Sequence, residues 1–216
     1  MVNLNYATDE KIYEAELKID NKKFAIFFNE QYNNLKKIHS EKNFYTKEEQ
    51  QIGIIYEPGS FCQYYNVFDW PSIELYDILL KIKETLKNAC AEYQIDYDEQ
   101  KYMIHGWFNY VTVKNFNGPT ENNLSWHDHG KRRNAFHGYY CVNAEPSITH
   151  YKINEKNIDR NNKNGRLIIA KTGIPHAVGR WEFSEPRITV AYNIMRLDDL
   201  LSTGIQNEEG PFIPLL

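Results

Sequence analysis

Residues 165–194 read GRLIIAKTGIPHAVGRWEFSEPRITVAYNI, and this stretch decides the fold. It holds two β-rich runs, 166–170 and 187–194, joined by a segment that contains Pro175-His176. Short apolar or alternating runs of this length between turn residues are typical of strands, whereas helices need a longer three- and four-residue periodicity. The stretch therefore predicts two strands of a β core, with a histidine between them.

The same pattern extends outward toward the N-terminus. From Ile104 onward, short β-rich runs follow one another, and turn-forming segments at 115–123 and 154–165 separate them. Several short strands at this spacing indicate a sandwich or a barrel. The expected strands are 107–113, 125–129, 136–142, 148–153, 166–170, 177–181 and 187–194.

The first hundred residues have a different pattern. Their clearest element is a helix that begins at Pro71-Ser72 and extends to about Tyr93, because apolar residues recur there at three- and four-residue steps. This N-terminal region is expected to pack on the β core. Its other expected elements are strands at 12–19 and 24–28, a short helix at 29–39, a polar connection at 40–51 and a strand at 52–56.

Length and composition predict a single domain. The 216 residues are 42% hydrophobic, which is enough for a substantial core. Within that domain we expect N-terminal strands and supporting helices over 1–103, a β core over 104–196 and a tail over 197–216.

Charge and cysteine content narrow the class of protein. A net charge of −4 without a strongly basic stretch argues against a nucleic-acid binder held by phosphate contacts. The three cysteines, Cys62, Cys90 and Cys141, form no CxxC pair and predict buried thiols in a reducing compartment. No apolar stretch approaches the roughly 20 residues of a membrane span. We therefore expect a cytoplasmic protein with no membrane partner.

His127 and His129 stand two residues apart in Leu124-Ser125-Trp126-His127-Asp128-His129. In an extended segment, side chains at i and i+2 point to the same face, so these two imidazoles can bind one cation while Asp128 points away. A pair of polar surface residues would give the same pattern. The pair is therefore a metal-site hypothesis that needs a further ligand.

Arg187 and Thr189 alternate along the last expected strand and can face one cavity. A buried guanidinium needs an anion, because an unpaired charge in the interior is costly. A planar carboxylate suits it through two parallel charge-assisted hydrogen bonds, and a threonine hydroxyl can add a donor. A structural ion pair, for instance with Glu185, explains Arg187 as well at this point.

Taken together, these motifs resemble the 2-oxoglutarate/Fe(II)-dependent oxygenase superfamily over about residues 105–195. The resemblance lies in the order of His-x-His, Gly-Tyr-Tyr, Gly-x-Leu-Ile-Ile, Pro-His and then Arg-x-Thr, which begins 11 residues (187 − 176) after the histidine. It is closest to small bacterial and phage members whose first motif is also His-x-His. It implies a mainly β (α+β) fold, with N-terminal strands and supporting helices around a cupin-like jelly roll, the double-stranded β-helix.

The resemblance also assigns roles to single residues. His127 corresponds to the first metal ligand and His176 to the distal histidine, while Arg187 corresponds to the residue that grips the far carboxylate of 2-oxoglutarate. The expected cofactor-binding residues are Arg187, Thr189, Tyr140 and Asn109.

One departure from the family pattern concerns the third metal ligand. His129 stands where most members have an aspartate, and Asp128 lies one residue earlier. Strand alternation favours an all-nitrogen site of His127, His129 and His176, whereas a β-bulge would turn Asp128 inward and restore a carboxylate. His137 follows within ten residues and can face the same cavity or be a satisfied strand histidine.

The resemblance implies an oxygenase that uses Fe(II), O2 and 2-oxoglutarate to hydroxylate an organic or peptidyl substrate, releasing succinate and CO2. Two other classes stay open. One is a cupin-like three-histidine metalloprotein that does not use 2-oxoglutarate, and the other is a non-catalytic metal-binding or assembly protein of the same fold. The substrate and a homodimeric state are also left open by the sequence.

Overall fold

The computed structural model describes residues 11–41, 62, 64–113, 126–130, 132, 134–203 and 210–215. The helices are α1 (Asn21–Glu41), α3 (Ile73–Glu92) and α4 (Leu197–Thr203), with short 3-10 turns η2 (Val67–Asp69) and η3 (Glu99–Lys101). The strands are β1 (Ile12–Glu16), β2 (Tyr102–Val111), β3 (Phe136–Asn143), β4 (Ile148–Ile153), β5 (Lys156–Asn161), β6 (Arg166–Lys171), β7 (His176–Val178), β8 (Arg187–Arg196) and β9 (Ile213–Pro214).

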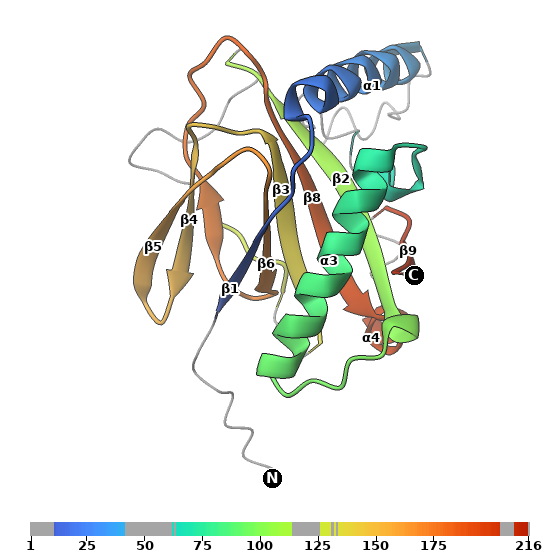
Figure 1. The fold of residues 1–216 in the computed structure, drawn as a ribbon, viewed down its shortest axis with the longest axis vertical. Helices are drawn as coiled ribbons and strands as arrows, with labels where there is room; N and C mark the ends of the chain where they lie inside the picture. The colour runs from blue at the N-terminus through green and yellow to red at the C-terminus, as the bar shows by residue number, and fades with distance from the viewer. Residues whose placement is uncertain are drawn as a thin grey trace, which may run out of the picture.

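These strands form two antiparallel sheets, as Figure 1 shows. The larger sheet has the order β1-β6-β3-β8-β2-β9, and the smaller has the order β5-β4-β7. Neighbouring strands in the larger sheet are far apart in sequence; β3, for example, pairs with β6 on one side and with β8 on the other. This crossing order brings residues from separate motifs side by side.

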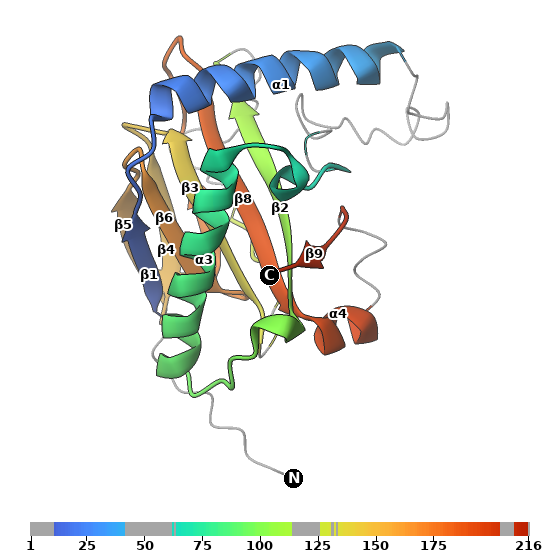
Figure 2. The same cartoon turned by 45° about the vertical axis from the view of Figure 1, so that its right-hand side comes forward.

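Helices α1 and α3 cover the outer face of the larger sheet, the face turned away from the smaller sheet (Figure 2). Helix α3 forms where the sequence predicts, because Ser72 caps it by accepting the Leu75 N–H at 3.3 Å and because its apolar residues share one face. Together with alternate residues of the sheet, the apolar faces of both helices make the main hydrophobic core.

The inner face of the larger sheet carries a different set of side chains. Along β3, Phe136 and Tyr140 pack in the outer core, whereas Tyr139 and Cys141 pack in a second cluster with Tyr151 of the smaller sheet. Alternation along a strand sends successive side chains to opposite faces, so each residue of β3 belongs to one layer or the other. His137 of β3 and Arg187 and Thr189 of β8 lie on the inner face.

Most of the predicted elements of the β core are confirmed, and two predictions are wrong. The predicted strand at 24–28 belongs to α1, which begins at Asn21 and includes the predicted helix at 29–39. Phe24 and Phe28 lie four residues apart and pack together in the outer core, a spacing that suits one helix face. The predicted turn at 154–165 contains strand β5, which pairs with β4 along its whole length.

Other predictions concern the ends of elements or residues outside the described part of the chain. Residues 126–130 contain one isolated bridge in place of the predicted strand at 125–129, and the strand predicted at 177–181 is β7, which begins at His176. The predicted strand at 52–56, the turn at 115–123 and most of the connection at 40–51 lie outside the described residues.

The predicted buried thiols are confirmed, since Cys62, Cys90 and Cys141 are all free and buried. Among the described residues, no helix has both the length and the apolar character needed to cross a membrane.

Candidate metal centre and anion pocket

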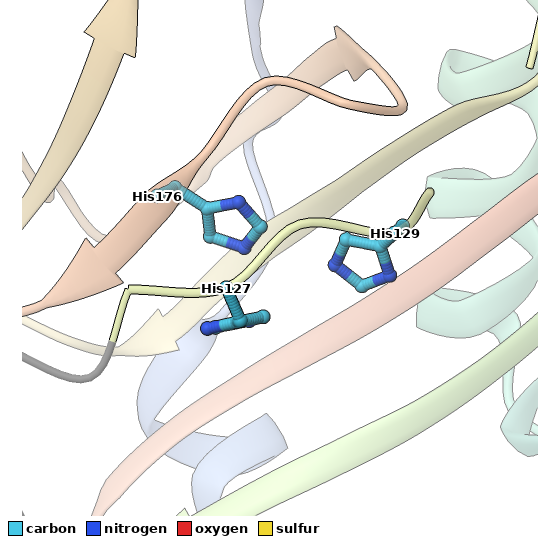
Figure 3. Close-up of side chains that lie close together, drawn as sticks. All are labelled: His127, His129 and His176. Carbon is cyan, nitrogen blue, oxygen red and sulfur yellow. The ribbon is translucent and has the colours of Figure 1, made fainter. Parts of the chain in front are cut away.

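The three histidines singled out from the sequence come together in the fold, as Figure 3 shows. His127 forms an isolated antiparallel bridge with His176, the first residue of β7, through two backbone hydrogen bonds of 3.0 and 2.9 Å. One ring nitrogen each of His127, His129 and His176 lies within 4.8 Å of the other two. Nitrogens bonded to one ion at about 2.1 Å lie at most about 4.2 Å apart, so small side-chain rotations would complete such a site.

Burial favours the neutral form of His129 and His176. Removal from water, and then the neighbouring rings, lowers the pKa of His129 to about 3, and the same two causes lower the pKa of His176 to about 4. Neutral imidazole is the form that binds metal. The Nδ1 of His176 lies 3.2 Å from the Ile174 carbonyl oxygen. Donation there leaves Nε2 as the lone-pair nitrogen, the arrangement in which ligating histidines are usually held.

Asp128 takes no part in the cluster. Its carboxylate accepts a hydrogen bond from the Gly130 N–H at 2.9 Å, and the residue is exposed. Of the two ligand sets predicted from the sequence, the described structure therefore assembles the all-nitrogen one, with His129 in place of a carboxylate.

Arg187 lies on the same inner face as the histidine cluster, and only 5% of its surface is exposed. Its Nε donates to the Ser147 hydroxyl at 3.1 Å. No ion pair found among the described residues includes Arg187, and the predicted alternative partner Glu185 is not paired with it. Burial lowers the pKa of the guanidinium, but not enough to discharge a group of this basicity. An anion would relieve this buried charge.

A hydrogen-bond network orients Arg187. The Ser147 hydroxyl donates to the Ala144 carbonyl oxygen at 2.5 Å, so its oxygen is left to accept from Arg187 and from the Asn162 amide, which is 2.9 Å away. The Tyr139 hydroxyl in turn donates to Asn162 Oδ1 at 2.9 Å. These contacts commit Nε of the guanidinium to the protein and hold its position.

Thr189 and Asn109, two of the expected cofactor-binding residues, are neighbours. They are cross-strand partners on β8 and β2, and the Asn109 amide donates to the Thr189 hydroxyl oxygen at 3.2 Å. Thr189 is buried and shares the inner face of β8 with Arg187. Because its oxygen already accepts from Asn109, the hydroxyl proton is available for another acceptor.

Tyr140 is not brought together with Arg187, contrary to the prediction. Its hydroxyl donates to Asn21 Oδ1 of α1 at 2.8 Å, and its ring packs in the outer core. The neighbouring Tyr139 lies on the inner face instead, where its hydroxyl joins the hydrogen-bond network of Arg187. A shift of one residue along a strand moves a side chain to the other face, and a Tyr-Tyr doublet does not reveal which tyrosine points inward.

His137 is the residue whose role the sequence left undecided. Its ring centre lies 4.5 Å from that of His129 and 4.6 Å from that of His176, and only 3% of its surface is exposed. No local spacing predicts this position, because it depends on which face of β3 is turned toward His176 of the smaller sheet.

Comparison with known proteins identifies solved structures that have a similar fold. No family model and no curated protein matches the sequence. Among solved structures, the non-heme monooxygenase ThoJ matches in its nickel complex and in its apo form, each at a TM-score of 0.52 over 87% of this chain and 74% of that chain, with 9% and 10% identity. This chain has the fold of a non-heme oxygenase.

That likeness confirms the predicted mainly β, jelly-roll architecture. A prolyl-4-hydroxylase from Pseudomonas putida also matches, at a TM-score of 0.45 and 10% identity over 87% of this chain and 93% of that chain. At these identities the likeness concerns the fold, and the chemistry has to be argued from the residues of this chain.

Proposed function

We propose that the protein is an Fe(II)- and 2-oxoglutarate-dependent oxygenase that hydroxylates an organic or peptidyl substrate and releases succinate and CO2. One observation carries the proposal. A cluster of three histidines shares the inner face of the fold with a buried arginine that has no carboxylate partner among the described residues. A divalent ion and a dicarboxylate would satisfy both groups together.

The donor set fits a divalent transition metal. Imidazole nitrogens suit iron, copper, nickel and zinc, and three of them leave open positions on the ion for other ligands. Compared with two histidines and a carboxylate, the cluster of His127, His129 and His176 carries one negative charge fewer. A dianionic co-substrate would offset the charge of the ion in this site.

The two groups lie at separate positions along one face of the larger sheet. On β3, His137 lies beside the histidine cluster, and Cys141 is the cross-strand partner of Thr189. Four residues of strand correspond to about 13 Å. Tyr139 lies on the same face of β3, between these two positions.

In this proposal the metal and the keto acid supply the oxidising chemistry when bound, and the chain supplies binding and position. The histidines hold the ion. Arg187 grips the far carboxylate through two charge-assisted hydrogen bonds, and Thr189 donates a third. Ser147 and Asn162 keep the guanidinium oriented, and the apolar inner cluster around Tyr151 limits access of water.

An anaerobic titration of the metal-free protein with Fe(II), followed by 2-oxoglutarate, tests the proposal. A weak visible charge-transfer band that appears only with both additions is expected. In Arg187→Met the Kd for 2-oxoglutarate should rise about 10- to 150-fold, because charge-assisted hydrogen bonds contribute about 1.5–3 kcal/mol. The affinity for Fe(II) should stay unchanged. Arg180→Met, which removes a surface arginine paired with Glu182, is the matched control.

Metal binding without any response to 2-oxoglutarate would contradict the proposal and support a cupin-like three-histidine metalloprotein. Equal loss of metal and 2-oxoglutarate in Arg187→Met would show that Arg187 supports the fold and does not bind the co-substrate.

A further inference from the structure

We propose that His137 is a fourth nitrogen donor, so that the metal centre without co-substrate is a four-histidine site. The inference rests on the proposed metal centre and is independent of 2-oxoglutarate use. It starts from the position of His137 on β3, whose inner face lies directly beside the cluster of His127, His129 and His176.

The ring positions agree with shared coordination. Because a metal–imidazole bond is about 2.1 Å long, the centres of two rings bound to one ion at 90–110° lie roughly 4.5–5.3 Å apart. Within the cluster, the ring centre of His176 lies 4.3 Å from that of His127 and 5.3 Å from that of His129. The ring centre of His137 lies 4.5 Å from that of His129 and 4.6 Å from that of His176. His137 thus lies as close to His129 and His176 as the members of the cluster lie to one another, whose widest ring-centre separation is the 5.7 Å between His127 and His129.

The hydrogen bonds of His137 leave one nitrogen ready for an ion. The ring donates a hydrogen bond to the backbone carbonyl oxygen of Lys171. Nε2 is buried and has no partner in the described part of the chain, so Nδ1 makes the bond to Lys171. A neutral ring that donates from Nδ1 carries its lone pair on Nε2.

His176 shows the same arrangement, because its Nδ1 lies 3.2 Å from the carbonyl oxygen of Ile174 and its Nε2 is not used in that bond. A backbone carbonyl at one ring nitrogen and a metal at the other is the usual environment of a ligating histidine. An ordinary core histidine satisfies both ring nitrogens, because a buried unpaired acceptor costs about 1–3 kcal/mol. A metal ion would satisfy the remaining nitrogen of His137.

Four imidazoles would leave two positions on a six-coordinate ion. A bidentate keto acid would fill both, so O2 could bind beside it only if one imidazole left. His127 is the ring most easily released, because it is exposed and its segment is held by an isolated bridge. With the fourth histidine in place, the centre would thus stay closed to O2 beside the keto acid until His127 left it.

Cu(II) is a suitable probe, because its electron paramagnetic resonance spectrum reports the number of coordinated nitrogens. One equivalent is added to the metal-free full-length protein. The wild type is expected to show four nitrogens, and His137→Phe and His137→Gln are expected to show three. Affinity for Co(II) should fall at least about tenfold in both variants. His105→Phe, at a buried histidine of β2, is the matched control and should keep four.

Three nitrogens in the wild type, with the same count in both His137 variants, would overturn the inference and leave the three-histidine centre intact. Absence of Cu(II) and Co(II) binding in the wild type would overturn the metal centre itself, and with it the proposed function. Thermal unfolding would show whether the His137 variants fold. If neither does, the number of nitrogens bound to Cu(II) in the wild type decides between the four-histidine and the three-histidine centre.

Discussion

Tyr139 and Tyr140 are adjacent in sequence, and removing their hydroxyl groups one at a time should have different functional effects. The Tyr139 hydroxyl donates to Asn162 at 2.9 Å on the inner face, and the Tyr140 hydroxyl donates to Asn21 at 2.8 Å on the outer face. Each change to phenylalanine deletes one hydrogen bond worth about 0.5–1.5 kcal/mol. For a chain of this size, a loss of about 1 kcal/mol corresponds to a fall in Tm of about 2–4 °C.

The two variants should therefore lose similar stability but differ in co-substrate binding. Asn162 also holds Ser147, which accepts from Arg187, so Tyr139→Phe loosens the arginine. We expect the Kd for 2-oxoglutarate to rise about three- to tenfold, which corresponds to roughly 0.7–1.4 kcal/mol. Tyr140→Phe should leave this Kd within about twofold of wild type. Calorimetric titration of the Fe(II)-loaded protein and thermal unfolding give both quantities. If the Kd for 2-oxoglutarate rose equally in both variants, or rose more in Tyr140→Phe, the assignment of Tyr139 to the hydrogen-bond network that holds Arg187 would be refuted.

Three further predictions follow from the site. In calorimetric titration, His129→Ala should weaken Fe(II) binding at least tenfold, and Asp128→Ala should leave it unchanged. If Asp128→Ala weakened Fe(II) binding and His129→Ala did not, Asp128 would be the third ligand. Gly138→Ala should destabilise the fold by about 1–3 kcal/mol in urea unfolding, because its Cβ would lie 2.0 Å from the Ile168 carbonyl oxygen; unchanged stability would contradict that packing. The pKa values of His129 and His176, about 3 and about 4, lie below their ordinary 6.5. Between these values and pH 6.5 the unfolded chain therefore binds more protons than the folded one. The metal-free protein should be most stable above pH 6.5 and should lose stability as the pH falls toward 4. A free energy of urea unfolding that does not change with pH would count against buried neutral rings.

The β core was predictable because its strands are short, alternating and bounded by turn residues. The strand at 148–153, for example, has the same ends in the structure as in the prediction. The segment at 24–28 was not predictable in this way, since five residues rich in phenylalanine fit a strand as well as a helix. Strand β5 was missed because Lys156–Asn161 is polar and partly exposed, so its pairing depends on β4 and not on its own pattern.

At the site, residues that lie two apart in one strand were predictable and residues from different strands were not. Arg187 and Thr189 share a face because alternation requires it. The approach of His137 to His176 depends on how the smaller sheet packs on the larger one, which no local spacing encodes. The network of Ser147 and Asn162 with Arg187 likewise joins segments up to 40 residues apart.

Asn66 joins its own segment to two others through side-chain hydrogen bonds, so the three segments should unfold together. Its amide nitrogen donates to the carbonyl oxygens of Ile104 on β2 and of Pro211 just before β9, both at 2.9 Å, and its Oδ1 accepts from the Gly106 N–H at 3.1 Å. The C-terminal segment therefore cannot open without leaving a buried amide unpaired beside β2. In a hydrogen-exchange experiment, the backbone amide protons of Gly106 and Leu215 should therefore become exposed in the same cooperative opening. The last residues of the chain then behave as part of the sheet that carries Asn109.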